Sequence, residues 1–266
     1  MVGRPVSLDV NKAKPQLGGV LLEVENLSIH DHTGRTLVKD VSFQLRAGEV
    51  LAVAGVQGNG QSELAEAIVG LQEHVAGSIR LDGTAIHPGK VRESLHAGIA
   101  FVPESREEDG LISSFSIEEN LILDLHDLAP FAKGPVISQS AVVENAAKRV
   151  VEFDIRAQSA KDAASSLSGG NKQKVVLARE LSRPVKLVVA SQPTRGLDVG
   201  SIEFVHERII AERDAGRGVL LFSTELDEVV ALADRIAVMY RGEIISIAPA
   251  DTSREELRLL MAGIKK

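Results

Sequence analysis

One glycine-rich segment constrains the fold more than any other part of the chain. Residues 55–62 read GVQGNGQS and lie between a short apolar run, 50–54, and a stretch with apolar residues at helical spacing. A strand, a glycine turn and a helix in this order let backbone N–H groups converge on an anion, and the helix N-terminus adds positive potential. The segment therefore predicts a phosphate-binding loop, with a glycine turn that binds nothing as the alternative.

The loop departs from the phosphate-loop pattern at a position that carries charge. The pattern is G-x-x-x-x-G-K-S/T, and Gln61 stands where it has lysine. Gln61 keeps N–H donors but lacks the positive charge. Since a hydrogen bond to a charged group contributes about 1.5–3 kcal/mol, phosphate affinity is expected to fall by roughly 10–100-fold. Ser62 keeps the hydroxyl that holds Mg²⁺ in such loops.

The composition bounds the class of protein. The chain has 266 residues, 44% of them hydrophobic and 25% charged, which is enough for one domain, or one domain with an inserted subdomain, around a large core. The absence of cysteine excludes disulfides and thiolate metal sites. A net charge of −7 argues against a protein that binds nucleic-acid phosphates. No apolar stretch reaches the roughly 18–20 residues that span a bilayer, so membrane association is expected to come through a partner protein.

Strand signals alternate with helix signals on both sides of a helix-rich middle. Apolar or alternating runs predict strands at 20–24, 41–45, 50–54, 99–102, 187–190, 219–222, 235–239 and 243–247. Helical spacing predicts helices after Gly60 and at about 200–214, 226–233 and 253–263. The alternation predicts an α/β fold with a mostly parallel sheet and helices on its faces. Residues 1–19 are expected to be a linker or leading arm.

The middle of the chain, about 116–182, carries mainly helix signals. Ser116 followed by Glu119 predicts a capping box at the start of a helix. The leucines that would share one face of this helix are Leu121, Leu125 and Leu128. Two more helices are expected, at 139–152 and after Gly170. We therefore predict an all-α insert in the α/β domain.

A second candidate anion site opens the last of these helices. Residues 167–174 read LSGGNKQK, with a serine and two glycines at a helix N-terminus. The alternative is a serine N-cap with a glycine hinge and no ligand. A short apolar strand, 187–190, follows, and residues 191–198 then read SQPTRGLD.

The order and spacing of these segments resemble the ATPase domain of ATP-binding-cassette (ABC) transporters over about residues 20–250. More narrowly, GVQGNGQSEL, VPESR, LSGGNKQK and ASQPTRGLDVG look like the second, C-terminal cassette of the tandem ATPases of bacterial nucleoside and simple-sugar importers, the nucleoside branch above all. The resemblance implies a P-loop NTPase-type sheet, an antiparallel β subdomain and an inserted helical subdomain. The RecA-like core with the β subdomain would comprise 20–104 and 183–266, and the helical subdomain with the signature loop would comprise 105–182.

The resemblance also implies roles for positions that this chain has changed. Ser191 matches an Asp that holds Mg²⁺, and Gln192 matches the Glu that acts as general base. A neutral serine does not balance a divalent cation, and a glutamine does not take a proton from water. Thr224 matches the switch His, and Glu104 matches the Gln that links the Mg²⁺ site to the membrane subunit. His32 loosely matches the aromatic residue that stacks on adenine. The positions of the ATP-binding loop are Gly55, Gly58, Asn59, Gly60, Gln61, Ser62 and Glu63.

By contrast, the signature loop keeps the family pattern. The residues that would contact ATP bound by a partner cassette are Ser168, Gly169, Gly170, Asn171, Lys172 and Gln173. Asp198, in the loop that meets the partner cassette, is also kept. The resemblance therefore implies a degenerate cassette whose signature loop serves a partner's ATP. ATP and Mg²⁺ would lie mostly at the partner's site, and hydrolysis would need that partner.

The resemblance implies several partners and one location. The partners are another cassette, expected to be the N-terminal half of the same polypeptide, transmembrane permease subunits and, indirectly, an extracytoplasmic solute-binding protein. Nucleic acid is not expected to bind, and the location would be the cytoplasmic face of the cell membrane. Two alternatives stay open: a soluble ABC-type ATPase that acts on ribosomes or nucleic acid, and a self-sufficient homodimeric transporter ATPase.

Two weaker features receive plain interpretations. Residues 106–109, which read REED, are expected to form a solvated turn, with the surface that meets the membrane subunit nearby. Glu203 and His206 are expected to be surface residues of one helix and not metal ligands.

Overall fold

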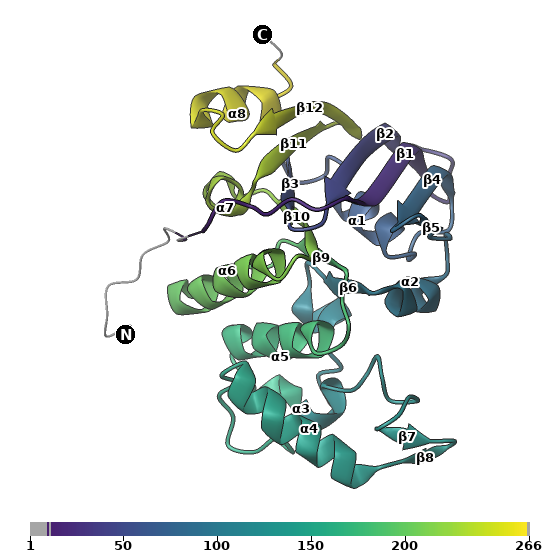
Figure 1. The fold of residues 1–266 in the computed structure, drawn as a ribbon, viewed down its shortest axis with the longest axis vertical. Coiled ribbons are helices and arrows are strands. Elements are labelled where there is room, and N and C mark those ends of the chain that lie inside the picture. The colour runs from purple at the N-terminus through teal and green to yellow at the C-terminus, as the bar shows by residue number, and fades with distance from the viewer. Residues whose placement is uncertain (1–9, 11, 265–266) are drawn as a thin grey trace. The chain divides into compact units, whose positions relative to one another are not determined.

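The computed structural model describes residues 10 and 12–264, and the chain folds into two compact units (Figure 1). The first, which we call the sheet unit, comprises residues 1–101, 185–192 and 203–266. The second, the helical unit, comprises residues 102–184 and 193–202. Residues 1–9 and 11 of the predicted arm lie outside the described residues, as does the C-terminal pair 265–266. Residues 12–18 form neither helix nor strand.

A six-stranded sheet forms the centre of the sheet unit. Its strand order is β12-β11-β3-β10-β9-β6. The strands are β3 (Val50–Ala54), β6 (Ile99–Val102), β9 (Leu187–Ser191), β10 (Gly218–Ser223), β11 (Arg235–Tyr240) and β12 (Glu243–Pro249). β11, β3, β10 and β9 pair in parallel, and β12 pairs with β11 in the antiparallel sense. Every residue of β3, β9 and β10 is buried, as is usual for parallel strands covered on both faces. The predicted, mostly parallel sheet is confirmed.

A second sheet in the same unit is antiparallel. Its order is β2-β1-β4-β5, built from β1 (Val20–His30), β2 (Thr36–Arg46), β4 (Val75–Leu81) and β5 (Thr84–Ala85). The sequence analysis missed β4 and β5. Gly77 interrupts the alternation of β4 with a φ of 95°, close to the point where the register between β1 and β4 shifts. A glycine inside a strand pattern often marks such an irregularity.

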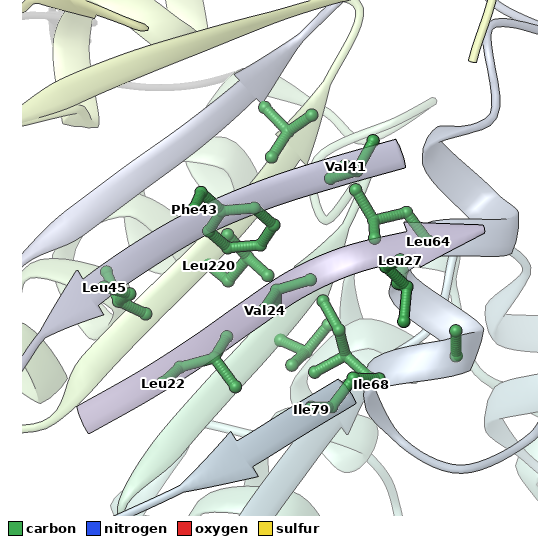
Figure 2. Close-up of a cluster of buried hydrophobic side chains, with 14 of the residues drawn as sticks. Leu22, Val24, Leu27, Val41, Phe43, Leu45, Leu64, Ile68, Ile79 and Leu220 are labelled. Atoms are coloured by element: carbon green, nitrogen blue, oxygen red, sulfur yellow. The ribbon is translucent and has the colours of Figure 1, made fainter. Parts of the chain in front are cut away.

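The main hydrophobic core fixes the helix that follows the glycine loop. This helix, α1 (Gln61–Ile68), contributes Leu64 and Ile68 to a cluster that contains side chains of both sheets (Figure 2). The other labelled members are Leu22, Val24 and Leu27 of β1, Val41, Phe43 and Leu45 of β2, Ile79 of β4 and Leu220 of β10. Burying a side chain of this size contributes about 1.5–3 kcal/mol. The start of α1 is therefore held rigidly, and with it the end of the glycine loop.

Four further helices complete the sheet unit. α7 (Leu226–Leu232) packs against β3 and β10, and α8 (Arg254–Met261) packs against β11. α2 (Val91–Ala97), which the sequence analysis did not predict, precedes β6. α6 (Val199–Asp214) begins in the helical unit and ends in the sheet unit.

The helical unit contains three complete α-helices and two single-turn helices. These are a π-helical turn at Arg106–Gly110, α3 (Ile117–Asn120), α4 (Gln139–Glu152), a 3₁₀ turn at Ala164–Ser166 and α5 (Gly169–Leu181). A hairpin of two-residue strands, β7 (Ala132–Lys133) and β8 (Val136–Ile137), lies between α3 and α4. The expectation of an all-α insert is therefore wrong in this detail.

The capping box of α3 is confirmed, but its helix is shorter than predicted. Glu119 N–H donates to Ser116 Oγ at 3.2 Å, and Ser116 N–H donates to Glu119 Oε2 at 2.7 Å. The chain then continues in turns from residue 121, and Leu128 is exposed. The spacing of the leucines matched a helix, although they belong to turns.

A buried ion network joins α5 to the turns after α3. Arg183 Nε donates to Asp124 Oδ2 at 3.0 Å, and Arg183 Nη2 donates to Glu180 Oε2 at 3.1 Å. Arg179 Nη1 donates to the Gly110 carbonyl at 2.8 Å. Burial, reinforced by the nearby Glu180 carboxylate, raises the pKa of Asp124 to about 6. The network thus fixes the helix that carries the signature loop at its C-terminal end.

Within the described residues, no helix is both long enough and apolar enough to span a bilayer.

Candidate nucleotide sites

The glycine loop of residues 55–60 connects the end of β3 to the start of α1. Gly58 and Gly60 have φ values of 84° and 98°, in the left-handed region that favours glycine. At Gly60 the space is also closed, because a Cβ would lie 2.8 Å from the Leu37 carbonyl oxygen. The sequence pattern therefore marks a loop whose curvature depends on glycine.

Asn59 ties the loop to the β11–β12 turn. Its Nδ2 donates to the Met239 carbonyl at 3.2 Å, and its Oδ1 accepts from Arg241 N–H at 3.0 Å. Its carbonyl accepts from Gly242 N–H at 3.0 Å. These bonds lie within the sheet unit and preset the loop shape before any ligand arrives.

Gln61 lies inside the loop and points toward its backbone. The residue is only 5% exposed, and its Nε2 is buried with no hydrogen-bond partner in the described part of the chain. A Cβ on Gly55 would lie 2.9 Å from that Nε2, so the amide sits directly against Gly55. A buried donor without a partner costs about 1–3 kcal/mol, which a phosphate oxygen at this place would offset. Ser62 and Glu63 follow it and are half-buried.

Three positions that the sequence analysis singled out lie at the same edge of the sheet as the loop. Ser191 ends β9 and Thr224 follows β10, and both strands run parallel to β3 in register. Gln192 adopts a φ of 47°, and its Oε1 accepts from both the N–H and the hydroxyl of Thr224 at 3.3 Å. A residue other than glycine in this region is uncommon and points to a constrained position. The carboxyl edge of the sheet therefore carries hydroxyl and amide groups at these positions and no carboxylate.

His32 lies in the exposed turn between β1 and β2. Asp31 Oδ1 holds this turn by accepting from Thr33 N–H at 2.8 Å and from Arg35 N–H at 3.0 Å. The Thr33 hydroxyl, which also donates to it, holds the pKa of Asp31 below its usual range. The imidazole of His32 is thus presented to solvent on an ordered turn.

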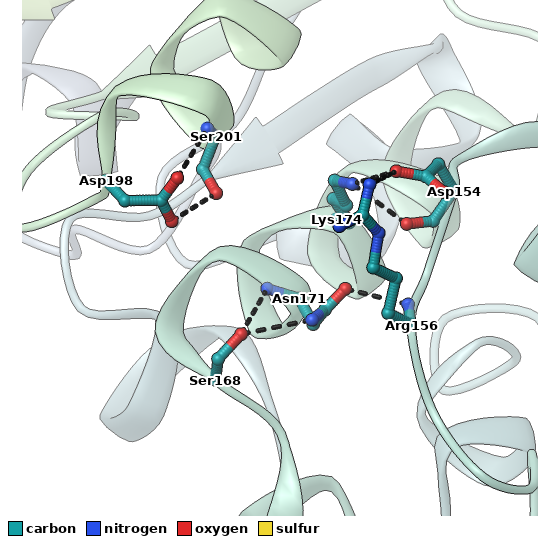
Figure 3. Close-up of polar contacts among 7 residues, drawn as sticks. All are labelled: Asp154, Arg156, Ser168, Asn171, Lys174, Asp198 and Ser201. Atoms are coloured by element: carbon teal, nitrogen blue, oxygen red, sulfur yellow. Dashed lines mark hydrogen bonds and ion pairs between the residues drawn. The ribbon is translucent and has the colours of Figure 1, made fainter. Parts of the chain in front are cut away.

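The signature loop begins with Ser168, which caps α5 (Figure 3). Its Oγ accepts from Asn171 N–H at 3.4 Å and from Asn171 Nδ2 at 3.0 Å. Asn171 Oδ1 in turn accepts from Arg156 N–H at 2.8 Å. Lys174 donates to Asp154 Oδ2 at 2.7 Å, and this bond lowers the pKa of Asp154. The first turn of α5 contains no acidic residue, so its N-terminus keeps its positive potential.

Both signature glycines lie against neighbouring segments of the helical unit. A Cβ on Gly169 would lie 2.9 Å from Arg106 Nη2, and a Cβ on Gly170 would overlap Ser201 Oγ. Lys172 Nζ pairs with Glu107 Oε1 at 2.8 Å, which lowers the pKa of Glu107. Gln173 Nε2 donates to the Pro193 carbonyl at 2.8 Å. At 170 in particular, the absence of a side chain lets the start of α5 approach the first turn of α6.

Asp198 lies close to the signature loop within the helical unit. Its Oδ2 accepts from Ser201 Oγ at 2.7 Å and its Oδ1 accepts from Ser201 N–H at 3.1 Å (Figure 3). The Ser201 hydroxyl bond, above other effects, lowers the pKa of Asp198. A Cβ on Gly170 would also be 3.2 Å from Asp198 Oδ2. The structure thus brings together two segments that the sequence analysis singled out separately.

Glu104 forms an ion pair that the sequence analysis missed. Its Oε1 pairs with Arg195 Nη1, and Arg106 Nη1 donates to the Arg195 carbonyl at 2.9 Å. Residues 107–109 are exposed, as expected for a solvated turn, but Arg106 is half-buried against other loops. Residues 104 and 195 are separated by 91 positions, and no periodic signal links them.

His206 is not a surface residue, contrary to the expectation from the sequence. It is 4% exposed, and its Nε2 lies 3.3 Å from Glu228 Oε1 on α7. His206 belongs to a face of α6 that looks polar in the sequence. This face is buried because Glu228 of α7 provides a polar partner for the imidazole. Among the described residues, no group of three or more His, Cys, Asp or Glu side chains is placed to hold a metal ion.

The architecture defines an ATP-binding-cassette fold. A nucleotide-free ATP-binding cassette from an ABC transporter has a TM-score of 0.75 and 22% identity, covering 92% of this chain and 96% of that chain. A dimeric cassette in a post-hydrolysis state, bound to ADP and Pi, has a TM-score of 0.75 and 20% identity, covering 88% of this chain and all of that one. The expected α/β fold with an antiparallel β subdomain is confirmed.

Sequence comparisons identify the family to which this chain belongs. Residues 38–195 match the ABC transporter family model. The guanosine import ATP-binding protein NupO of Bacillus subtilis (strain 168) is 43% identical over 264 residues, 99% of this chain and 52% of that protein. The glucose import ATP-binding protein TsgD13 of Haloferax volcanii is 40% identical over 99% of this chain and 48% of that protein. This chain belongs to the ABC transporter family and is homologous to nucleoside and sugar import ATP-binding proteins. It spans about half the length of these relatives.

Proposed function

We propose that this chain is the nucleotide-binding domain of an importer for nucleosides or simple sugars and that it donates its signature loop to ATP held by a partner cassette. The observation that carries the proposal is a contrast within one chain. The signature segment keeps its cap, its glycines and the bonds that hold it. The phosphate-loop edge has neutral groups at Gln61, Ser191 and Gln192, where this family's chemistry needs charge.

The phosphate loop fits a nucleotide phosphate but offers little to Mg²⁺. Gly58 and Gly60 curve the backbone, and the buried Nε2 of Gln61 is a hydrogen-bond donor with no acceptor among the described residues. These features suit a phosphate oxygen. Ser62 supplies the one hydroxyl of this loop for a metal, whereas Ser191 and Gln192 carry no negative charge to balance a divalent ion. The loop would therefore hold a nucleotide weakly and without hydrolysis, with His32 as the residue available to stack on its base.

The signature loop suits a different role, contact with a nucleotide that another cassette holds. The ATP held by the partner cassette supplies the phosphoanhydride bond, and the signature loop of this chain would orient the γ-phosphate. The Ser168 hydroxyl and the N–H groups at the start of α5 point a positive helix end at the γ-phosphate. Fixed donors of this kind stabilise developing negative charge without reorganisation, because their bonds already hold them in place. Lys172 and Gln173 fix the loop, and Asp198 meets the partner beside it.

The relatives suggest the assembly in which this happens. Their names describe ATP-binding proteins for guanosine, nucleoside and ribose import, and each is about twice the length of this chain. We infer that the partner cassette precedes this chain in one polypeptide. The pair would serve permease subunits at the cytoplasmic face of the membrane, with a solute-binding protein on the other side.

Steady-state ATP hydrolysis tests the proposal, with the chain alone and then mixed with its partner cassette. We expect no magnesium-dependent turnover alone and clear turnover on mixing. Turnover by the chain alone would favour the self-sufficient homodimer. No turnover on mixing, combined with co-purification of ribosomes or nucleic acid, would favour a soluble ATPase of the same family.

A further inference from the structure

We propose that Glu104, Arg106 and Arg195 form a clamp that positions the signature loop. The proposal rests on the donation of this loop to a partner's ATP. All three residues belong to the helical unit, so the clamp is internal to one compact body. Glu104 departs from the family pattern, and the clamp assigns it a positioning role that requires no metal ion.

The clamp first joins two segments that are far apart in the sequence. Arg195 Nη1 pairs with Glu104 Oε1, and the Arg195 carbonyl accepts from Arg106 Nη1 at 2.9 Å. Arg195 is thus held at its side chain and at its backbone by residues only two positions apart. Such a double attachment fixes the direction of the chain at 195, just before the turn at Gly196, whose φ is 68°.

Arg106 extends the clamp to the signature loop. A Cβ on Gly169 would lie 2.9 Å from Arg106 Nη2, so the guanidinium is in contact with the loop backbone. A Cβ on Gly196 would lie 3.8 Å from the same nitrogen. One guanidinium therefore lies between the signature loop and the loop that leads to Asp198. Arg106 thus contacts both loops through one side chain.

The charges explain why an acid suits position 104. Cations near a helix N-terminus are disfavoured by the helix dipole, and α5 begins at Gly169 beside Arg106. Arg106 Nε is also buried without a hydrogen-bond partner among the described residues, which adds an energetic cost to holding the guanidinium at this place. The Glu104 carboxylate balances the second cation, Arg195, in the same cluster. A neutral glutamine at 104 would leave the exposed Arg195 guanidinium without this carboxylate partner.

Hydrogen exchange of the full chain tests the clamp directly, with the backbone amides of residues 168–172 as the readout. Glu104→Gln and Arg195→Gln should each speed exchange there by about two- to fivefold, the size expected for a partly exposed ion pair. The charge swap Glu104→Arg with Arg195→Glu should bring exchange back toward the original rate. The matched control is Lys39→Gln, which breaks the exposed Lys39–Glu243 pair of the sheet unit and should leave residues 168–172 unchanged.

A kinetic readout separates positioning from simple loss of stability. In the mixed assembly, Glu104→Gln should lower kcat for the partner's ATP while KM stays within about twofold, because the loop acts only when the cassettes close. Unchanged exchange in both single variants, or a charge swap that is no better than either, would overturn the clamp. If the unaltered chain restores no turnover to its partner, the proposed function fails, and the exchange result still decides the clamp.

Discussion

The phosphate loop and the signature loop are two glycine-containing turns, each at the N-terminus of a helix, and they differ in the charge of the side chains around them. In the phosphate loop, contacts to neighbouring segments set the backbone shape. Asn59 ties the loop to the β11–β12 turn, and Gly60 packs against Leu37. The side chains that would handle charge, at 61, 191 and 192, are neutral. In the signature loop, both the backbone and the surrounding charged contacts are present.

This difference teaches that the shape of a phosphate loop and its chemistry depend on different residues. The shape is set by the core beneath α1 and by backbone contacts, which folding needs in any case. The charge at the loop is set by a few side chains, of which Gln61 and Ser191 are buried and neutral. Neutral side chains at 61, 191 and 192 are therefore compatible with this fold.

Blocking the signature loop should give the largest effect. Ser168→Arg replaces the cap of α5 with a bulky cation where the partner's γ-phosphate would lie. We expect turnover of the mixed cassettes to fall by about 100-fold or more, since removal of a single preorganised donor already costs that much in other sites. Ser140→Arg, at an exposed position of α4, is the matched control and should leave turnover unchanged. Equal losses in both variants would mean that added charge alone is responsible.

Placing a lysine in the phosphate loop should sharpen the comparison of the two loops. Gln61→Lys adds a positive charge at the buried position beside Gly55, so nucleotide affinity of this chain should rise by roughly 10–100-fold. Titration with a fluorescent ATP analogue measures it. Gln57→Lys places the same charge on an exposed residue of the same loop and should change affinity much less. If both variants bind the nucleotide equally tightly, the gain comes from long-range electrostatics, and position 61 does not contact the phosphate directly.

The buried ion network of the helical unit should show a distinct pH dependence. The folded-state pKa of Asp124 is raised to about 6, above its unfolded value of about 3.9. The native state therefore binds the proton more tightly. This contribution to stability is present below about pH 4 and is lost as pH rises through about 6.

Asp124→Asn removes that titration. From about pH 4 to about pH 7, the difference in the free energy of unfolding between the variant and the unaltered chain should move in favour of the variant by about 2 kcal/mol. Urea unfolding at both pH values measures the change. A difference that stays constant with pH would show that Asp124 keeps an ordinary pKa.

The smallest predicted effect concerns the contact between the signature loop and the loop of Asp198. Gly170→Ala would force a methyl group into Ser201 Oγ, which should lower the free energy of unfolding by about 1 kcal/mol. Adding Ser201→Ala should recover part of this loss because it removes the overlapping oxygen. Gly19→Ala, at a position with nothing within 4 Å of the new carbon, is the control and should be neutral or slightly stabilising. A loss at 170 that Ser201→Ala does not relieve would place the strain elsewhere.

Much of the fold was predictable because the sheet unit depends on local signals. The parallel strands β3, β9 and β10 are apolar along almost their whole length and stand out as short buried runs. The capping box of α3 is a pattern of four residues and was found. β4 escaped because Gly77 breaks its alternation, and the leucines after α3 matched a helical period although they lie in turns.

The candidate loops were predictable for the same reason, and their contacts were not. Glycine spacing identified both loops, since each needs a backbone without side chains at fixed positions. The Glu104–Arg195 pair and the buried His206–Glu228 pair each join residues from different elements. Such pairings depend on tertiary structure, and no pattern in a single sequence reveals them. His206 in particular looks like a polar surface residue until α7 is in place.

The central claim, that this chain's signature loop contacts ATP held by another cassette, is tested most directly by photo-crosslinking. The probe is an ATP analogue with a photoreactive group on its γ-phosphate, added to the chain alone and to the chain mixed with its partner cassette. Peptide mapping then locates the label. We predict labelling of the segment around Ser168–Asn171 only when the partner is present, and its loss in Ser168→Arg. Labelling confined to residues 55–62 of this chain, with none near Ser168 in the mixture, would contradict the account.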